Sequence, residues 1–256
     1  MLLPADEAGR GPVIVLLHAR PTDRTMWTVH LPLFAAAGFR VIAPDLPGYG
    51  AAIAHGRGEL TPWTDVLETL DHLGAERFVL AGNSLGALVA LNVAVLAPDR
   101  VEGLVLVGYR RHDQEPSARL RKAWDDEQTA LARGDLDAAV RAGVEAWTSA
   151  DAAPEVKAHA DRMLREQLTS RLTHGETPLA AAPLDETPGA LGTLAGPALV
   201  GVGGHDLPDF FRGGEELAGE LGAGELVVIP GAGHLAPLEQ PAAFVGLVRD
   251  FVASSR

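Results

Sequence analysis

A serine between two glycines is the residue whose type and setting best fit chemistry in this sequence. Ser84 lies in the segment GNSLG at 82–86, directly after an apolar, strand-like run at 77–81 and at the start of a helical pattern at 85–97. A sharp strand-to-helix turn of this kind exposes the serine hydroxyl, and the glycines give the chain room to fold tightly. The backbone N–H of Leu85 can then stabilise a developing oxyanion. We interpret Ser84 as a catalytic nucleophile; the alternative is a turn that only caps a helix.

A histidine close to the C-terminal end is the candidate general base. His234 lies in the segment PGAGHL at 230–235, on the loop after the last strand-like run. From such a loop an imidazole can reach the serine and take its proton. His234 could instead cap the helix near Pro241 or face solvent. Most of the other eight histidines lie on helical patterns or loops without a companion motif.

An aspartate between these two motifs is the candidate acid. Asp206 lies in the segment GGHDLP at 203–208, at the end of a strand-like run. A carboxylate there can accept the Nδ1 proton of His234 and fix its tautomer. The order serine, acid, histidine is the expected one. Asp209 is the main rival, and we expect it to cap the following helix instead.

A loop after the first buried strand supplies the fourth motif. The segment HARP at 18–21 follows the apolar run 13–19, and by position the backbone N–H of Arg20 is the second oxyanion donor. The Arg20 side chain has two possible roles. It can pair with an acidic cap residue such as Asp113 or Glu115, or it can face the substrate and favour a carboxylate-bearing ester or lactone.

Apolar, β-branched runs alternate with helical patterns along most of the chain. Such runs suit strands that are buried on both faces of a parallel sheet. The alternation indicates βαβ units, so we expect an α/β fold with a doubly wound, mostly parallel sheet, whose strand carboxyl ends share one edge. The stretch before residue 13 leaves room for one short edge strand. The expected strands are 13–19, 40–44, 77–81, 101–107, 197–203 and 225–230, and the expected helices are 26–37, 62–73, 85–97, 209–221 and 241–253.

The interval from about 111 to 190 contains helical patterns but no strand-like run. We therefore expect an α/β core of 1–110 and 190–256 with an inserted helical cap of 111–189. The cap would cover a substrate pocket, for which the candidate lining residues are His18, Tyr109, Trp124 and Trp147. For both tryptophans, core packing within the cap is an equal alternative. The expected cap helices are 116–133, 135–148 and 154–172.

The composition excludes several classes of protein. The 256 residues include no cysteine, which excludes a disulfide framework and a thiolate metal site. Neither an HxxxH nor an HExxH pattern occurs, so we expect no metal. The net charge of −13 argues against nucleic acid and anionic membranes as partners. No apolar run reaches the ~18 residues of a membrane span, and the first residues do not resemble a signal peptide, so we expect a cytoplasmic protein.

The motifs together resemble those of the α/β-hydrolase superfamily. Within it, the chain is similar to the capped group of 3-oxoadipate enol-lactonases, small-molecule esterases and cofactor-free perhydrolases. The resemblance covers 11–108 and 196–254, and it includes the turn PDLPGYG at 44–50. It implies the α/β-hydrolase fold, a triad of serine, aspartate and histidine, and no cofactor.

The sequence departs from the family pattern at informative positions. Ala19 replaces a usual glycine, and Arg20 stands where an aromatic residue is frequent, so both changes fall in the oxyanion loop. Epoxide hydrolases and haloalkane dehalogenases carry aspartate at the position of Ser84, so we exclude these two enzyme classes as the expected function. Ring-cleavage C–C hydrolases usually carry tryptophan where this chain has Leu235. We therefore rank this enzyme class below esterases and lactonases.

These observations lead to an expected activity. We expect a serine hydrolase that cleaves a small-molecule carboxylic ester or lactone through an acyl-enzyme, with Ser84, Asp206 and His234 as triad. The alternatives are a C–C bond hydrolase or perhydrolase of the same fold, or a non-catalytic ligand-binding protein. The expected partner is a small-molecule substrate, and the oligomeric state stays open.

Overall fold

The computed structural model describes residues 1–256 except 21, 55, 57, 188, 195 and 256. Pro21, the last residue of the HARP segment, thus lies outside the described residues.

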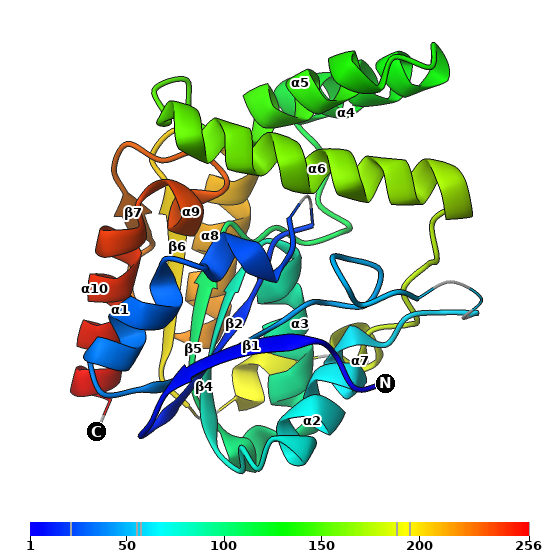
Figure 1. Ribbon diagram of the computed structural model, residues 1–256. Coiled ribbons are helices and arrows are strands. Elements are labelled where there is room, and N and C mark those ends of the chain that lie inside the picture. Colours follow the sequence, from blue (N-terminus) through cyan, green and yellow to red (C-terminus); the bar gives the residue numbers. More distant parts are fainter. Residues whose placement is uncertain (21, 55, 57, 188, 195, 256) are drawn as a thin grey trace.

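A seven-stranded sheet forms the centre of the described structure, in the order β1-β3-β2-β4-β5-β6-β7 (Figure 1). Strand β1 pairs antiparallel with β3, and all other neighbours are parallel. The expected α/β class is therefore confirmed, and β1 is the short edge strand for which the N-terminal stretch left room. The strands are β1 Ala5–Gly9, β2 Val13–Leu17, β3 Arg40–Pro44, β4 Phe78–Asn83, β5 Val101–Val107, β6 Ala198–Gly203 and β7 Val227–Ile229.

Helices cover both faces of the sheet (Figure 1). Side chains alternate across each strand, so Ile14 and Leu16 join one hydrophobic cluster while Val15 and Leu17 join the other. Phe34 of α1 and Phe244 of α10 belong to the first cluster, whereas α2, α3 and α8 contribute to the second. These helices are α1 His30–Ala36, α2 Pro62–His72, α3 Leu85–Leu96, α8 Pro208–Leu221 and α10 Pro241–Ser254.

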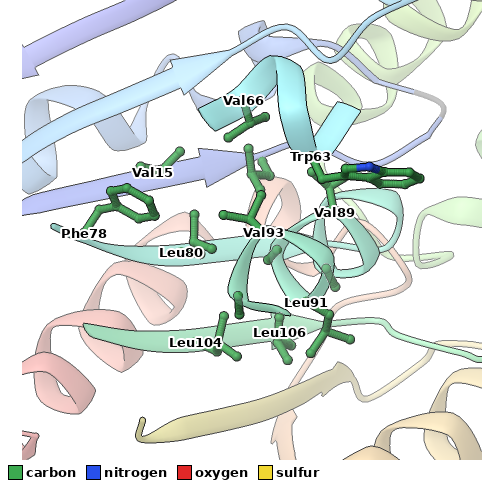
Figure 2. Close-up of a cluster of buried hydrophobic side chains, with 14 of the residues drawn as sticks. Val15, Trp63, Val66, Phe78, Leu80, Val89, Leu91, Val93, Leu104 and Leu106 are labelled. Atoms are coloured by element: carbon green, nitrogen blue, oxygen red, sulfur yellow. The ribbon is translucent and has the colours of Figure 1, made fainter. Parts of the chain in front are cut away.

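The second cluster fixes the helix that follows Ser84. Figure 2 shows Val15, Phe78 and Leu80 of the sheet in one cluster with Val66 of α2 and Val93 of α3. Helix α3 is apolar on nearly all sides, because it lies between the sheet and α2. Its start, where Ser84 stands, is therefore held by a packed core.

Three helices form a layer above the carboxyl edge of the sheet (Figure 1). Ser117 and Asp135 cap α4 and α5, and Ala139, Val140 and Leu164 pack among them in a small cluster of their own. Their bounds are α4 Ala118–Ala132, α5 Leu136–Trp147 and α6 Pro154–His174, which agree closely with the three helices expected for the cap.

The segment after α6 returns to the core. Leu179 forms a bridge with Leu60, and Leu184 N donates a hydrogen bond of 2.9 Å to Asn92 Oδ1 on α3. The returning segment contains α7 Pro183–Glu186 and the 3₁₀ helix η3 Ala190–Thr193; α9 Ala236–Glu239 precedes α10, and η2 Pro98–Arg100 precedes β5.

One expected helix is wrong in its extent. The pattern at 26–37 forms two elements, the 3₁₀ helix η1 Arg24–Trp27 and then α1. Proline lacks an N–H and is tolerated only in the first turn of a helix. Pro32 therefore requires α1 to begin at about His30.

Candidate active site

The turn between β4 and α3 places Ser84 in an unusual backbone conformation. Its φ of 55° and ψ of −110° make it the one non-glycine residue with positive φ in the described part of the chain. A Cβ on Gly82 would lie 2.3 Å from Gly86 C, and one on Gly86 would lie 2.0 Å from Leu17 O. Both positions therefore require glycine. Strain of about 1–3 kcal/mol at such a turn persists only where surrounding structure enforces it.

His234 and Asp206 form a buried pair at the neighbouring strand ends. His234 Nδ1 lies 3.0 Å from Asp206 Oδ2, and both residues are almost fully buried. Asp206 Oδ1 also accepts a hydrogen bond from Leu207 N at 2.7 Å. Because an ionised carboxylate only accepts, the Nδ1 proton faces Asp206 and the Nε2 lone pair of a neutral His234 is left available.

Asp209 serves a different element from the one expected. Its carboxylate accepts hydrogen bonds from Ser117 N at 2.7 Å and Ser117 Oγ at 2.5 Å, so it fastens the start of α4. The expectation that it caps α8 is wrong, since the cap residue of α8 is Leu207 without a side-chain bond. Burial acts to raise the pKa of Asp209, but the hydrogen bonds from Ser117 hold it below its ordinary value.

Two side chains that the sequence reasoning missed hold the histidine in place. Asn83 is fully buried, and its Nδ2 donates to the carbonyl oxygens of Val107 (3.2 Å) and His234 (3.1 Å). The Phe210 ring lies against the imidazole with 4.0 Å between centroids. No local pattern distinguishes these residues, because both contacts join segments that are distant in sequence.

A third missed residue connects the histidine loop to the layer of α4, α5 and α6. Glu239 Oε1 accepts a hydrogen bond from Gly233 N, and Oε2 accepts one from Ser149 N, each at 2.9 Å. Leu235 N donates to Trp147 O at 3.0 Å. A Cβ on Gly233 would lie 2.6 Å from Ser149 N, so this approach also requires glycine.

A cavity of about 500 Å³ brings most of the predicted residues together. Ser84 and His234 line it with Arg20 and Leu85, the two residues expected to supply the oxyanion hole. Leu85 is the first residue of α3, so its N–H has no acceptor within the helix. The other lining side chains include Trp124, Trp147, Phe210 and Arg110.

Two predicted pocket residues are not among those that line this cavity. His18 is fully buried: its Nε2 accepts from Leu46 N and its Nδ1 bonds Ala19 O, both at 2.9 Å, so it braces the loop. Burial lowers the pKa of His18. Tyr109 packs in the hydrophobic core, where burial raises its pKa to about 12. Both side chains are buried away from the cavity.

The Arg20 side chain pairs with an acidic residue, but not with one of those suggested. Its partner is Glu176, just beyond α6. Asp113 and Glu115 instead pair with Arg111 (3.1 Å) and Arg121 (2.7 Å). Arg20 and Glu176 also line an adjoining cavity of about 460 Å³.

A larger hollow of about 1180 Å³ lies between α4, α5 and α6 and the loop after β6. It reaches Asp206 but neither Ser84 nor His234, and its rim is lined by charges of both signs. Among these three cavities of the described residues, the one of about 500 Å³ is lined by both Ser84 and His234, and it is therefore the candidate site.

Metal-binding clusters and membrane-spanning helices are both absent from the described residues. No group of three or more His, Cys, Asp or Glu side chains is arranged to hold a metal ion. No described helix combines the length and the apolar character needed to cross a bilayer.

Comparison with known proteins places the chain in a family. Over 244 residues it is 35% identical to the dihydrolipoyllysine-residue acetyltransferase component of the acetoin cleaving system of Pseudomonas putida, a match that covers 90% of this chain and 60% of that protein's length. A solved thermophilic esterase from Thermogutta terrifontis, with malate bound, has a TM-score of 0.78 and 28% identity and covers 99% of this chain and 93% of its own.

The enol-lactonase from Burkholderia xenovorans LB400 is also similar in structure, with a TM-score of 0.77 and 26% identity over 98% of this chain and 96% of that one. The model of the alpha/beta hydrolase family matches residues 14–247. With the sheet, the strained turn and the buried acid–histidine pair described above, this match shows that the chain belongs to the alpha/beta hydrolase family.

Proposed function

We propose that this protein is a serine hydrolase that cleaves small-molecule carboxylic esters or lactones through an acyl-enzyme. The observation that carries the proposal is that Ser84, on its strained turn, and His234, held by Asp206, line one cavity. A protein that only binds ligands has no need of a strained serine and an oriented imidazole in one cavity. The similarity to an esterase and to an enol-lactonase supports the same class of substrate.

The reaction divides into two steps with the same machinery. Ser84 Oγ attacks the substrate carbonyl while His234 Nε2 takes the hydroxyl proton, and the N–H groups of Leu85 and Arg20 stabilise the oxyanion. His234 then gives this proton to the leaving alkoxide oxygen as the C–O bond breaks. Water, deprotonated by His234, attacks the acyl-enzyme, and the proton returns to Ser84 as the acid product leaves.

Replacement of the serine tests the proposal directly. We expect the wild-type protein to hydrolyse 4-nitrophenyl acetate and Ser84→Ala to lose at least about a thousandfold in kcat, because the nucleophile is gone. Ser170→Ala, in the adjoining cavity, is the matched control and should stay within about twofold. Equal activity of wild type and Ser84→Ala would remove the proposed nucleophile.

A substrate panel separates the related reactions. Esters of increasing chain length, enol-lactones and ring-cleavage products should be compared by kcat/KM. We expect esters or lactones to be preferred, and a preference for ring-cleavage products would instead indicate a C–C bond hydrolase.

A further inference from the structure

The candidate cavity is lined by more positive than negative charge. Arg20, Arg110 and Arg171 line it, but only Glu127 and Glu176 do so among the acidic residues. With its histidines neutral, the described lining therefore has a formal charge of +1, although the whole chain has a net charge of −13. Positive charge concentrated in a site of an acidic protein attracts anionic ligands.

Two of these arginines already have carboxylate partners. Arg20 pairs with Glu176. Arg171 Nη2 lies 3.1 Å from Glu127 Oε1, and its Nη1 lies 4.0 Å from Glu176 Oε2. Both glutamates are thereby used by these two arginines, which leaves Arg110 as the source of the excess charge.

Arg110 is held in place without a carboxylate. Its Nη2 donates to Gln114 O, and its guanidinium carbon lies 5.7 Å from the centre of the Trp124 ring. Among the ion pairs of the described residues, none includes Arg110, and its Nε is buried with no hydrogen-bond partner. The nearby Asp209 carboxylate accepts its hydrogen bonds from Ser117 and acts on Arg110 only as an opposite charge without a direct ion pair. Burial lowers the pKa of Arg110, and the charge of Asp209 offsets this only in part.

An arginine that lines a cavity and has no ion-pair partner can bind an anionic ligand there through its guanidinium. A carboxylate suits this arginine because its two oxygens match the planar guanidinium. Its single negative charge also balances the excess of +1, whereas a phosphate monoester brings a charge of about −1.5 to −2.

We propose that Arg110 forms a carboxylate subsite of the candidate active site, so that the preferred substrates are esters or lactones that carry one carboxylate away from the reacting carbonyl. This inference rests on the proposed hydrolase function and names its substrate class. Arg110 then fixes one end of the substrate while Ser84 attacks the other.

The test compares two esters that differ in one charge. Mono-4-nitrophenyl adipate carries a free carboxylate, and its methyl ester, 4-nitrophenyl methyl adipate, is neutral and nearly the same length. We expect wild type to prefer the anionic ester in kcat/KM by about tenfold or more, since hydrogen bonds to charged groups are the stronger class. Arg110→Gln should lose about tenfold or more with the anionic ester and change by about twofold or less with the neutral one.

The neighbouring arginine provides the matched control. Arg111 does not line the cavity and pairs with Asp113 and Glu220, so Arg111→Gln removes the same charge and should leave the ratio of the two esters unchanged. Arg110→Lys keeps the charge without the planar fork and should lie between wild type and Arg110→Gln. Thermal unfolding of each variant reports whether it folds.

Two kinetic results would overturn the subsite. The first is a wild-type protein that does not prefer the anionic ester, a measurement that needs no variant. The second is an equal loss on both esters in Arg110→Gln, which would show that Arg110 only supports its surroundings. If wild type hydrolyses neither ester, the proposed function fails, and calorimetry with monomethyl adipate then tests the subsite. Binding by wild type that is lost in Arg110→Gln would support the subsite. The absence of binding by wild type would overturn it.

Discussion

Asp206 and Asp209 stand close together in the sequence, yet their carboxylates have different partners, His234 and Ser117. Asp206→Asn should keep the fold but lower kcat by roughly a thousandfold or more, because an amide favours the wrong tautomer of His234. Asp209→Asn should chiefly lower the free energy of unfolding, since it weakens the contact that fastens α4. The measurements are kcat with 4-nitrophenyl acetate and urea unfolding. A severe kinetic effect at Asp209 with a mild one at Asp206 would reassign the acid.

The positions of Ser84, Asp206 and His234 could be predicted because each lies in a short segment directly after a strand. Parallel strands bring such segments to one edge, so local patterns are enough to place them together. Asn83 and Phe210 could not be predicted in the same way. Their roles depend on which loop faces them in three dimensions, and a single sequence does not contain that information.

At the scale of elements, Glu239 connects the loop of His234 to the layer of α4, α5 and α6. Glu239→Gln keeps the shape but replaces one acceptor by a donor, so the N–H of either Gly233 or Ser149 loses its bond. We expect kcat to fall about tenfold and the free energy of unfolding by about 1–2 kcal/mol. The exposed Glu225 provides a control, and Glu225→Gln should change neither quantity. Unchanged kcat in Glu239→Gln would mean that this connection does not position the histidine.

The succession of strands and helices could largely be predicted from apolar runs and helical periodicity. The exceptions have local causes. Pro32 divides the expected helix at 26–37, and α7 and α9 are single turns, which are too short to produce a periodic pattern. The return of the segment after α6 toward Leu60 depends on backbone pairing across the molecule and has no signal in that segment.

At the scale of the whole molecule, a buried histidine makes stability depend on pH. His30 Nε2 donates to Pro237 O at 3.0 Å, and its ring is fully buried beside Trp27 and Phe244. Burial lowers the pKa of His30 to about 4 from the ordinary value of 6.5. Between these values the unfolded chain binds a proton that the folded protein does not. His30 should therefore lower the free energy of unfolding as pH falls through this window, by up to roughly 3 kcal/mol.

Urea unfolding between pH 7 and pH 4 measures this effect. His30→Gln should be less stable than wild type at pH 7, because it loses packing, but its free energy of unfolding should change less across the window. The difference between the two proteins isolates His30 from the other groups that titrate, including His18. Parallel curves for wild type and His30→Gln would contradict this role of His30.

The most direct test of the central claim is covalent labelling of the native protein by a fluorophosphonate probe, followed by mass spectrometry of its peptides. Such a probe requires a serine that is activated by a base and faces an oxyanion hole. We predict one adduct, on Ser84, which is strongly slowed in His234→Ala and absent in Ser84→Ala. A protein that hydrolyses esters while Ser84 stays unlabelled, or that carries the adduct on another serine, would contradict the account.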